Sequence, residues 1–257
     1  MTTKKKTSVK EETPTMAAQF DQGQEPTICC VNLAKTPLGF ELESLVVAMQ
    51  EFIDLHFKPI WQVGCKLISS PSIIPGTWGM VFLDDSDEAG ALGYHDLTAD
   101  GLPMSKVFLN TLAKNDEEVS VTASHELVEY LIDPGIQMLA QGPKGFYAYE
   151  VADMVETETF PVGNFNMTNF CTPAWFEIFR EPGSARFDYL NSCKRPFEIR
   201  PGGYMSIFAK GRWTQEFGSR AAKKTFLIED HQRGMLRQPL KLKVSRPIMR
   251  LRPSNAK

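Results

Sequence analysis

A helix with a sharply marked end constrains the fold more than any other feature of this sequence. Residues 120–132 read SVTASHELVEYLI and are followed directly by Asp133, Pro134 and Gly135. Proline removes an amide donor and glycine permits a turn, so the helix should stop before this tripeptide. Asp133 lies two turns beyond His125 on the same face, but its D-P-G setting favours a role as the helix stop over a role as a ligand.

The helix contains an H-E-x-x-E pattern. His125 and Glu129 are one turn apart on the same face, and Glu126 lies about 100° round the helix axis. In the H-E-x-x-H pattern of metallopeptidases, two helix side chains bind zinc and the glutamate activates a water molecule. Glu129 stands where that pattern has its second histidine, and a carboxylate still binds zinc although it is a harder ligand than imidazole. We predict His125 and Glu129 as metal ligands and Glu126 as the catalytic base.

An acid-rich stretch further along the chain can complete this site. YEVADMVE places Glu150, Asp153 and Glu156 at three-residue intervals. Zinc needs at least one more protein ligand, for which Asp153 is the first choice and Glu150 the second. Because one histidine among several carboxylates makes a site rich in oxygen, we expect Zn²⁺, with Ca²⁺ or Mn²⁺ as alternatives.

Other histidines and acidic residues are not expected to bind a metal ion. His56 falls on an apolar helix face and is expected in the core, whereas His95 is expected in a loop, as a hydrogen-bonding group rather than a ligand. The acidic residues 84–88 lack the alternation of a calcium loop and are expected to form a solvated turn. A peptidase also needs an oxyanion stabiliser, and Tyr147, Tyr149 or His95 could supply the donor.

The order of elements predicts an α/β or α+β fold with a mixed sheet. Strands are expected at residues 27–34, 65–68 and 78–83, and apolar spacing predicts a helix over residues 42–56. Beyond Gly135 the chain is rich in Gly, Pro and aromatic residues, so we expect short strands at best. GGYMSIFAKGRW has a hairpin-like pattern.

A last strand before the H-E-x-x-E helix is predicted at residues 104–110, MSKVFLN. In metallopeptidases of this pattern an edge strand lies along the cleft and can pair with an extended peptide. We assign that place to residues 104–110. Lys106, Val107 and Phe108 are therefore the expected substrate-binding positions.

Composition excludes several other classes of protein. With 42% hydrophobic residues among 257, the chain can bury an ordinary core, and no apolar run is long enough to cross a membrane. The five cysteines include no CxxC pair, which indicates neither a disulfide framework nor a cysteine zinc site. GxSxG, GxxxxGK[ST] and strand-associated GxGxxG motifs are absent, so the sequence does not support a hydrolase triad, a nucleotide-binding loop or a dinucleotide-binding site. We expect synthesis in a reducing cytoplasm, without a standard signal peptide.

Charge and composition divide the chain into an arm, a domain and an extension. Residues 1–25 are polar and rich in lysine, so they are predicted as a flexible arm. Residues 26–215 are predicted as the domain, with a first sub-domain up to residue 135 and an irregular one over residues 136–215. Residues 216–257 are a basic extension: from residue 209 onward, 13 Lys and Arg face three acids.

Four segments together resemble a poorly characterised family of bacterial and tailed-phage proteins with a zincin-like H-E-x-x-E signature. They are WGMVFLDDSDEAGALGYHDLTADGLPMSKVFLNT, SVTASHELVEYLIDP, YAYEVADMVE and NFCTPAWF, and the resemblance covers about residues 26–215. It implies a zincin-like, metallopeptidase-like fold and a phage or prophage setting. The matched site positions are His125, Glu126, Glu129, Glu150 and Asp153.

Two functional hypotheses follow. In the first, the protein is a zinc-dependent peptidase acting on a peptide or protein substrate. In the second, it is a structural or assembly protein of a phage virion with little or no catalysis, and the arm and basic tail bind neighbouring virion proteins. Nucleic acid is the least favoured partner of the tail.

Overall fold

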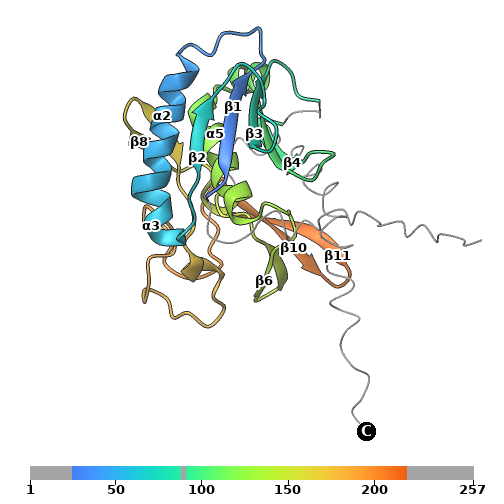
Figure 1. Ribbon diagram of the computed structural model, residues 1–257. Coiled ribbons are helices and arrows are strands. Elements are labelled where there is room, and N and C mark those ends of the chain that lie inside the picture. Colours follow the sequence, from blue (N-terminus) through green and yellow to red (C-terminus); the bar gives the residue numbers. More distant parts are fainter. Residues whose placement is uncertain (1–24, 88–90, 219–257) are drawn as a thin grey trace, which may run out of the picture.

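The computed structural model describes residues 25–87 and 91–218, which form a mixed α+β fold with three sheets (Figure 1). The largest sheet contains five strands: β1 (Thr27–Asn32), β2 (Lys66–Ser69), β3 (Trp78–Leu83), β4 (Gly93–Leu97) and β5 (Pro103–Phe108). Their spatial order is β2-β1-β3-β5-β4. All neighbours are parallel except β4, which is antiparallel to β5, so the predicted mixed sheet is confirmed.

The edge strand is not the one predicted. Residues 104–110 contain most of β5, which lies between β3 and β4, while β4 forms the edge. The segment that forms β4, GYHDL, has few apolar residues and gave no strand signal of its own. Val107 and Phe108 are fully buried, and Lys106 forms an ion pair with Asp87. A peptide bound at this edge therefore could not contact Val107 or Phe108, and the interpretation of β5 as the edge strand was wrong.

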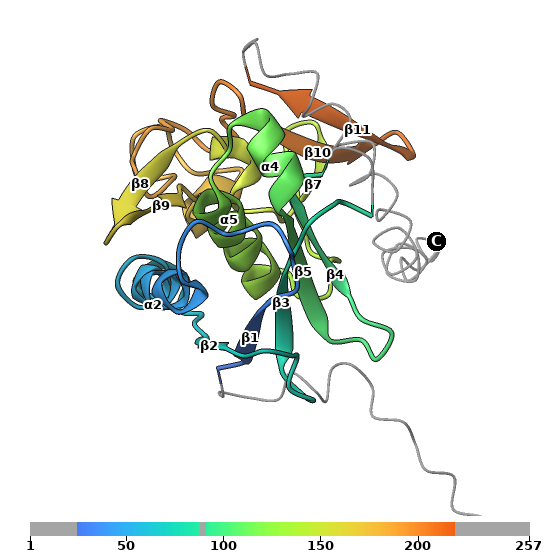
Figure 2. The same ribbon diagram turned by 90° about the horizontal axis from the view of Figure 1, so that it is seen from above.

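Helices cover one face of this sheet. The predicted helix over residues 42–56 is α2 (Leu42–Phe52), which continues through the π-helical turn η1 (Ile53–Phe57) into α3 (Lys58–Trp61). The wide turn precedes Pro59, which has no amide hydrogen to donate to the helix. α2 packs against β1 and β2. After the short helix α4 (Leu109–Asn115), α5 (Val119–Ile132) contacts β4 and β5 on one side and β9 on the other (Figure 2).

The second half of the domain consists of short strands, as predicted. One antiparallel sheet has the order β11-β10-β7-β6, and it contains β6 (Leu139–Gly142), β7 (Gly145–Ala148), β10 (Tyr204–Ala209) and β11 (Arg212–Phe217). β8 (Thr159–Val162) and β9 (Phe165–Thr168) form a separate two-stranded ribbon. The 3₁₀ turns are η2 (Asp153–Val155) and η3 (Pro173–Phe176). The predicted hairpin is β10–β11, so the expected boundary after residue 215 falls inside β11.

One apolar core joins both halves. It includes Met49 of α2, Leu127 of α5, and Phe170 and Trp175 from the second half, all fully buried. Burying each such side chain contributes about 1.5–3 kcal/mol. The first and second predicted sub-domains therefore share a hydrophobic core.

The predictions for the termini fall almost wholly outside the described residues. The arm and the basic extension correspond to residues 1–24 and 219–257, apart from the few residues at their inner ends. Within residues 25–87 and 91–218, no helix is long and apolar enough to cross a membrane.

Candidate metal centre

The residues that flank helix α5 determine where it begins and ends. It begins after Glu118, whose backbone is extended, and ends at Asp133. The Asp133 carboxylate accepts hydrogen bonds from the backbone N–H groups of Gln137 and Met138, both at 2.9 Å. Asp133 thus closes the turn after the helix, and its predicted role as a stop is confirmed.

His125, Glu129 and Asp153 form a cluster, which we call the helix-side trio. His125 Nε2 lies 3.3 Å from Glu129 Oε2 and 3.4 Å from Asp153 Oδ1, and one ligand atom from each residue lies within 4.8 Å of the others. Zinc bonds of about 2.1 Å in tetrahedral geometry put neighbouring ligand atoms roughly 3.4 Å apart. The spacing of these atoms therefore fits a common metal ion. The three residues chosen from the sequence as ligands do come together.

Asp153 is held in place by the second half of the domain. It begins η2, and the Met154 carbonyl in the same turn accepts a hydrogen bond from the backbone N–H of Arg200 at 2.9 Å. Gly203 packs against this turn so closely that an added Cβ would lie 2.3 Å from the Met154 oxygen. Only a residue without a side chain permits this approach, so the segment leading into β10 fixes the position of Asp153.

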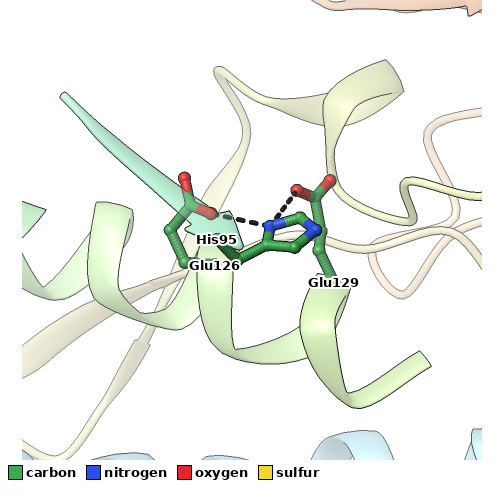
Figure 3. Close-up of side chains that lie close together, drawn as sticks. All are labelled: His95, Glu126 and Glu129. Atoms are coloured by element: carbon green, nitrogen blue, oxygen red, sulfur yellow. Dashed lines mark hydrogen bonds and ion pairs between the residues drawn. The ribbon is translucent and has the colours of Figure 1, made fainter. Parts of the chain in front are cut away.

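His95, Glu126 and Glu129 form a second cluster, the strand-side trio (Figure 3). His95 Nδ1 lies 3.0 Å from Glu126 Oε2 and 3.9 Å from Glu129 Oε2. The exposed fractions of the three residues are 5%, 7% and 4%. His95 was predicted in a loop and outside the ligand set, whereas it lies on β4 and points into the centre.

The approach of β4 to α5 explains the position of His95. Buried and more exposed residues alternate in the first four residues of β4, so that Gly93 and His95 both face α5. A Cβ added to Gly93 would lie 2.8 Å from Thr122 Cγ2 and 3.2 Å from Glu126 Cγ. Neither this alternation of burial nor the close approach of Gly93 to α5 can be read from the residues GYHDL, so the local sequence held no signal that identified His95.

Glu150 lies beside the strand-side trio. Its Oε2 is 3.6 Å from His95 Nε2, the ring nitrogen that points away from Glu126. Its side chain is 14% exposed. Glu150, predicted as the alternative to Asp153, therefore lies beside His95 and not in the helix-side trio.

The remaining candidates take structural positions. His56 Nδ1 lies 2.7 Å from the Tyr189 hydroxyl, in a half-buried aromatic cluster. Tyr149 stacks on Phe176, and Tyr147 is buried in the core. His95, the third donor considered for an oxyanion, belongs to the strand-side trio.

The electrostatics of the cluster favour a bound cation. Burial lowers the pKa of His125, but the charge of Glu129 and hydrogen bonds with Asp153 and Glu129 outweigh it and hold the pKa well above its usual value. Burial also lowers the pKa of His95, and contact with Glu126 and the charge of Glu150 again raise it overall. Burial and the charge of Glu129 raise the pKa of Asp153. In each case the carboxylates attract positive charge, which protons or a metal ion can supply.

Comparison with protein-family models, with curated proteins and with solved structures finds no match to this chain. A functional assignment therefore depends on the geometry of the buried cluster. That geometry offers two imidazoles and several carboxylates, a donor set suited to divalent cations.

Proposed function

We propose that this chain is a metal-dependent peptidase with a zincin-like fold. The observation that carries the proposal is the convergence of His125 Nε2, Glu129 Oε2 and Asp153 Oδ1, whose spacing fits the ligand shell of a divalent cation. Zn²⁺ suits a site with an imidazole and two carboxylates, and Mn²⁺ or Ca²⁺ are the alternatives.

Glu126 is the proposed general base. Its carboxylate lies within 4.8 Å of the Glu129 ligand oxygen, and it is 7% exposed. A cation held by the helix-side trio would supply Lewis-acid chemistry. Glu126 accepts the proton of the attacking water and returns it to the leaving amine, which contributes typically about 10²–10⁴-fold to the rate. His95 contacts the Glu126 carboxylate and fixes its orientation.

The arrangement of sheet and helix supports a peptide substrate. Strand β4 pairs on one side with β5, and its other edge has no neighbouring strand in the described part of the chain. It also carries His95 of the strand-side trio. An extended peptide that adds to this edge would place its backbone along the centre.

Metal content and activity test the proposal separately. The purified full chain should contain bound metal by elemental analysis, and it should cleave members of a mixed peptide library followed by mass spectrometry. Glu126→Gln should keep the ion of the helix-side trio but lose cleavage. His125→Ala should lose that ion, while His56→Gln, which alters a histidine outside the cluster, should behave as wild type. Metal-free wild type, or full cleavage by Glu126→Gln, would contradict the assignment.

Assembly into a virion is a second candidate function. Its supporting observation is the segregation of charge, with 13 Lys and Arg after residue 208 in a chain of net charge −3. A basic extension can bind an acidic surface on a neighbouring protein. If particles containing the protein can be purified, deletion of residues 238–257 should prevent its incorporation, and normal incorporation would contradict this candidate.

A further inference from the structure

The strand-side trio has the dimensions of a metal site in its own right. Its ligand atoms are 3.0 Å and 3.9 Å apart along the two contacts of His95, which brackets the roughly 3.4 Å expected between ligands of one ion. All three residues are at least nine-tenths buried. Figure 3 shows the His95 imidazole between the two carboxylates.

Glu129 connects the two trios through a single oxygen. Its Oε1 accepts a hydrogen bond from the backbone N–H of Ala152 at 3.2 Å. The other oxygen, Oε2, faces both imidazoles, at 3.3 Å from His125 Nε2 and 3.9 Å from His95 Nδ1. A carboxylate in this position can bridge two ions, as in two-metal sites, where the ions are about 3.5–4 Å apart.

Glu150 lies on the side of His95 where a metal-binding histidine usually has a supporting carboxylate. When one imidazole nitrogen binds a metal, the other commonly donates its N–H to a carboxylate, which fixes the ring orientation. His95 Nδ1 faces the strand-side trio, and its buried Nε2 faces Glu150 Oε2 at 3.6 Å. Within residues 25–87 and 91–218, no group forms a hydrogen bond with His95 Nε2, and Glu150 Oε2 is an acceptor that a small shift would bring into range.

Charge also favours more than one cation. The centre contains four carboxylates, those of Glu126, Glu129, Glu150 and Asp153. The two imidazoles that face them, His95 and His125, carry no charge when they bind metal. One divalent ion would leave half of this negative charge to be balanced by protons. Two divalent ions would balance it.

We propose that the centre binds two divalent cations bridged by Glu129, with the second ion held by His95, Glu126 and Glu129. The second position requires no contribution from His125 or Asp153. It has a consequence for catalysis that rests on the proposed function: Glu126 cannot accept a proton while it binds an ion. The form with one ion is then the active one, and the second ion suppresses activity.

Binding stoichiometry tests this proposal independently of activity. The metal-free full chain is dialysed against Mn²⁺ alone, and bound metal per chain is measured by elemental analysis. We expect two ions in wild type and His56→Gln, and one in His95→Ala, Glu126→Gln and His125→Ala. The ion that remains in each variant also shows that the variant is folded. With two ions bound, electron paramagnetic resonance should show exchange coupling, which the one-ion variants should lack.

The outcomes separate the two proposals. One ion in wild type that persists in His95→Ala and Glu126→Gln would overturn the second position and leave the helix-side trio intact. Two ions that both persist in these variants would place the second ion elsewhere and overturn the inference too. One ion in wild type that His125→Ala retains and His95→Ala loses would overturn both the two-ion centre and the ligand set of the proposed function.

Discussion

The two histidines of the centre reach it from regions of different kinds. His125 comes from helix α5 together with Glu129, four residues away, and the helix periodicity alone brings the pair together. His95 comes from the edge strand β4, and it meets Glu126 only because β4 pairs with β5 and packs against α5. The first arrangement is local and readable from sequence, whereas the second depends on strand order and on a glycine contact.

Removal of the ligand common to both regions should have the largest effect. Glu129→Ala deletes the oxygen that faces both histidines, so binding of either ion should weaken by more than the roughly 10–100-fold expected for loss of a supporting group. Calorimetric titration with Mn²⁺ measures this. Asp133→Asn is the matched control, because Asp133 is a buried acid on the same helix end but binds backbone amides instead. Equal losses in both variants would contradict a bridging role.

Metal-induced stabilisation should distinguish the two regions next. At a free concentration 100 times Kd, an ion that binds only the folded chain stabilises it by about 2.7 kcal/mol. His125→Ala should lose the stabilisation that comes from the ion of the helix-side trio. His95→Ala should lose the stabilisation that comes from the ion of the strand-side trio. Chemical denaturation with and without Mn²⁺ gives both values. If either variant keeps the full stabilisation, its histidine is not a ligand.

Two glycines allow each region to be disturbed without removing a ligand. Gly203→Ala forces a Cβ against the Met154 carbonyl and should displace Asp153, while Gly93→Ala presses on Thr122 and Glu126. Overpacking of this kind costs about 1–3 kcal/mol of folding stability. We expect Gly203→Ala to weaken the ion of the helix-side trio and Gly93→Ala that of the strand-side trio, each several-fold. The opposite pairing in titrations would refute the structural distinction.

The smallest predicted effect is a pH dependence of the metal-free chain. Because the pKa of folded His125 is raised, its contribution to stability is complete below its unfolded pKa of about 6.5 and is lost as pH rises through the folded pKa. The difference in unfolding free energy between wild type and His125→Asn should therefore shrink as pH rises above about 6.5. Denaturation in chelator at a series of pH values measures this, and a growing difference would contradict it.

Sequence predicted the parts of this molecule that local patterns determine. The helix over residues 120–132, its stop at Asp133 and the strands β1 to β3 follow from periodicity and from turn residues. The choice of Asp153 followed from spacing in an acid-rich stretch, and the turn η2 places it beside His125.

The errors arose where partners far apart in the chain decide the structure. GYHDL is too polar to indicate a strand, yet in the structure it pairs with β5 and forms the edge of the sheet. Because this strand was not predicted, β5 was wrongly assigned to the edge and His95 was not recognised as part of the metal centre. Glu150 was chosen for its spacing, but its place beside His95 Nε2 depends on β4, whose position the local pattern does not specify.

The contacts on both sides of α5 have a consequence for exchange kinetics. The helix lies between the five-stranded sheet and the β8–β9 ribbon, and Ser124 Oγ accepts the backbone N–H of Thr168 at 2.9 Å. Its amide hydrogens should therefore exchange with solvent only when the whole domain unfolds. A helix that cannot open locally does not admit an ion by fraying, so entry is expected past the side chains of His125 and Glu150, which are 12% and 14% exposed against 6% for His95.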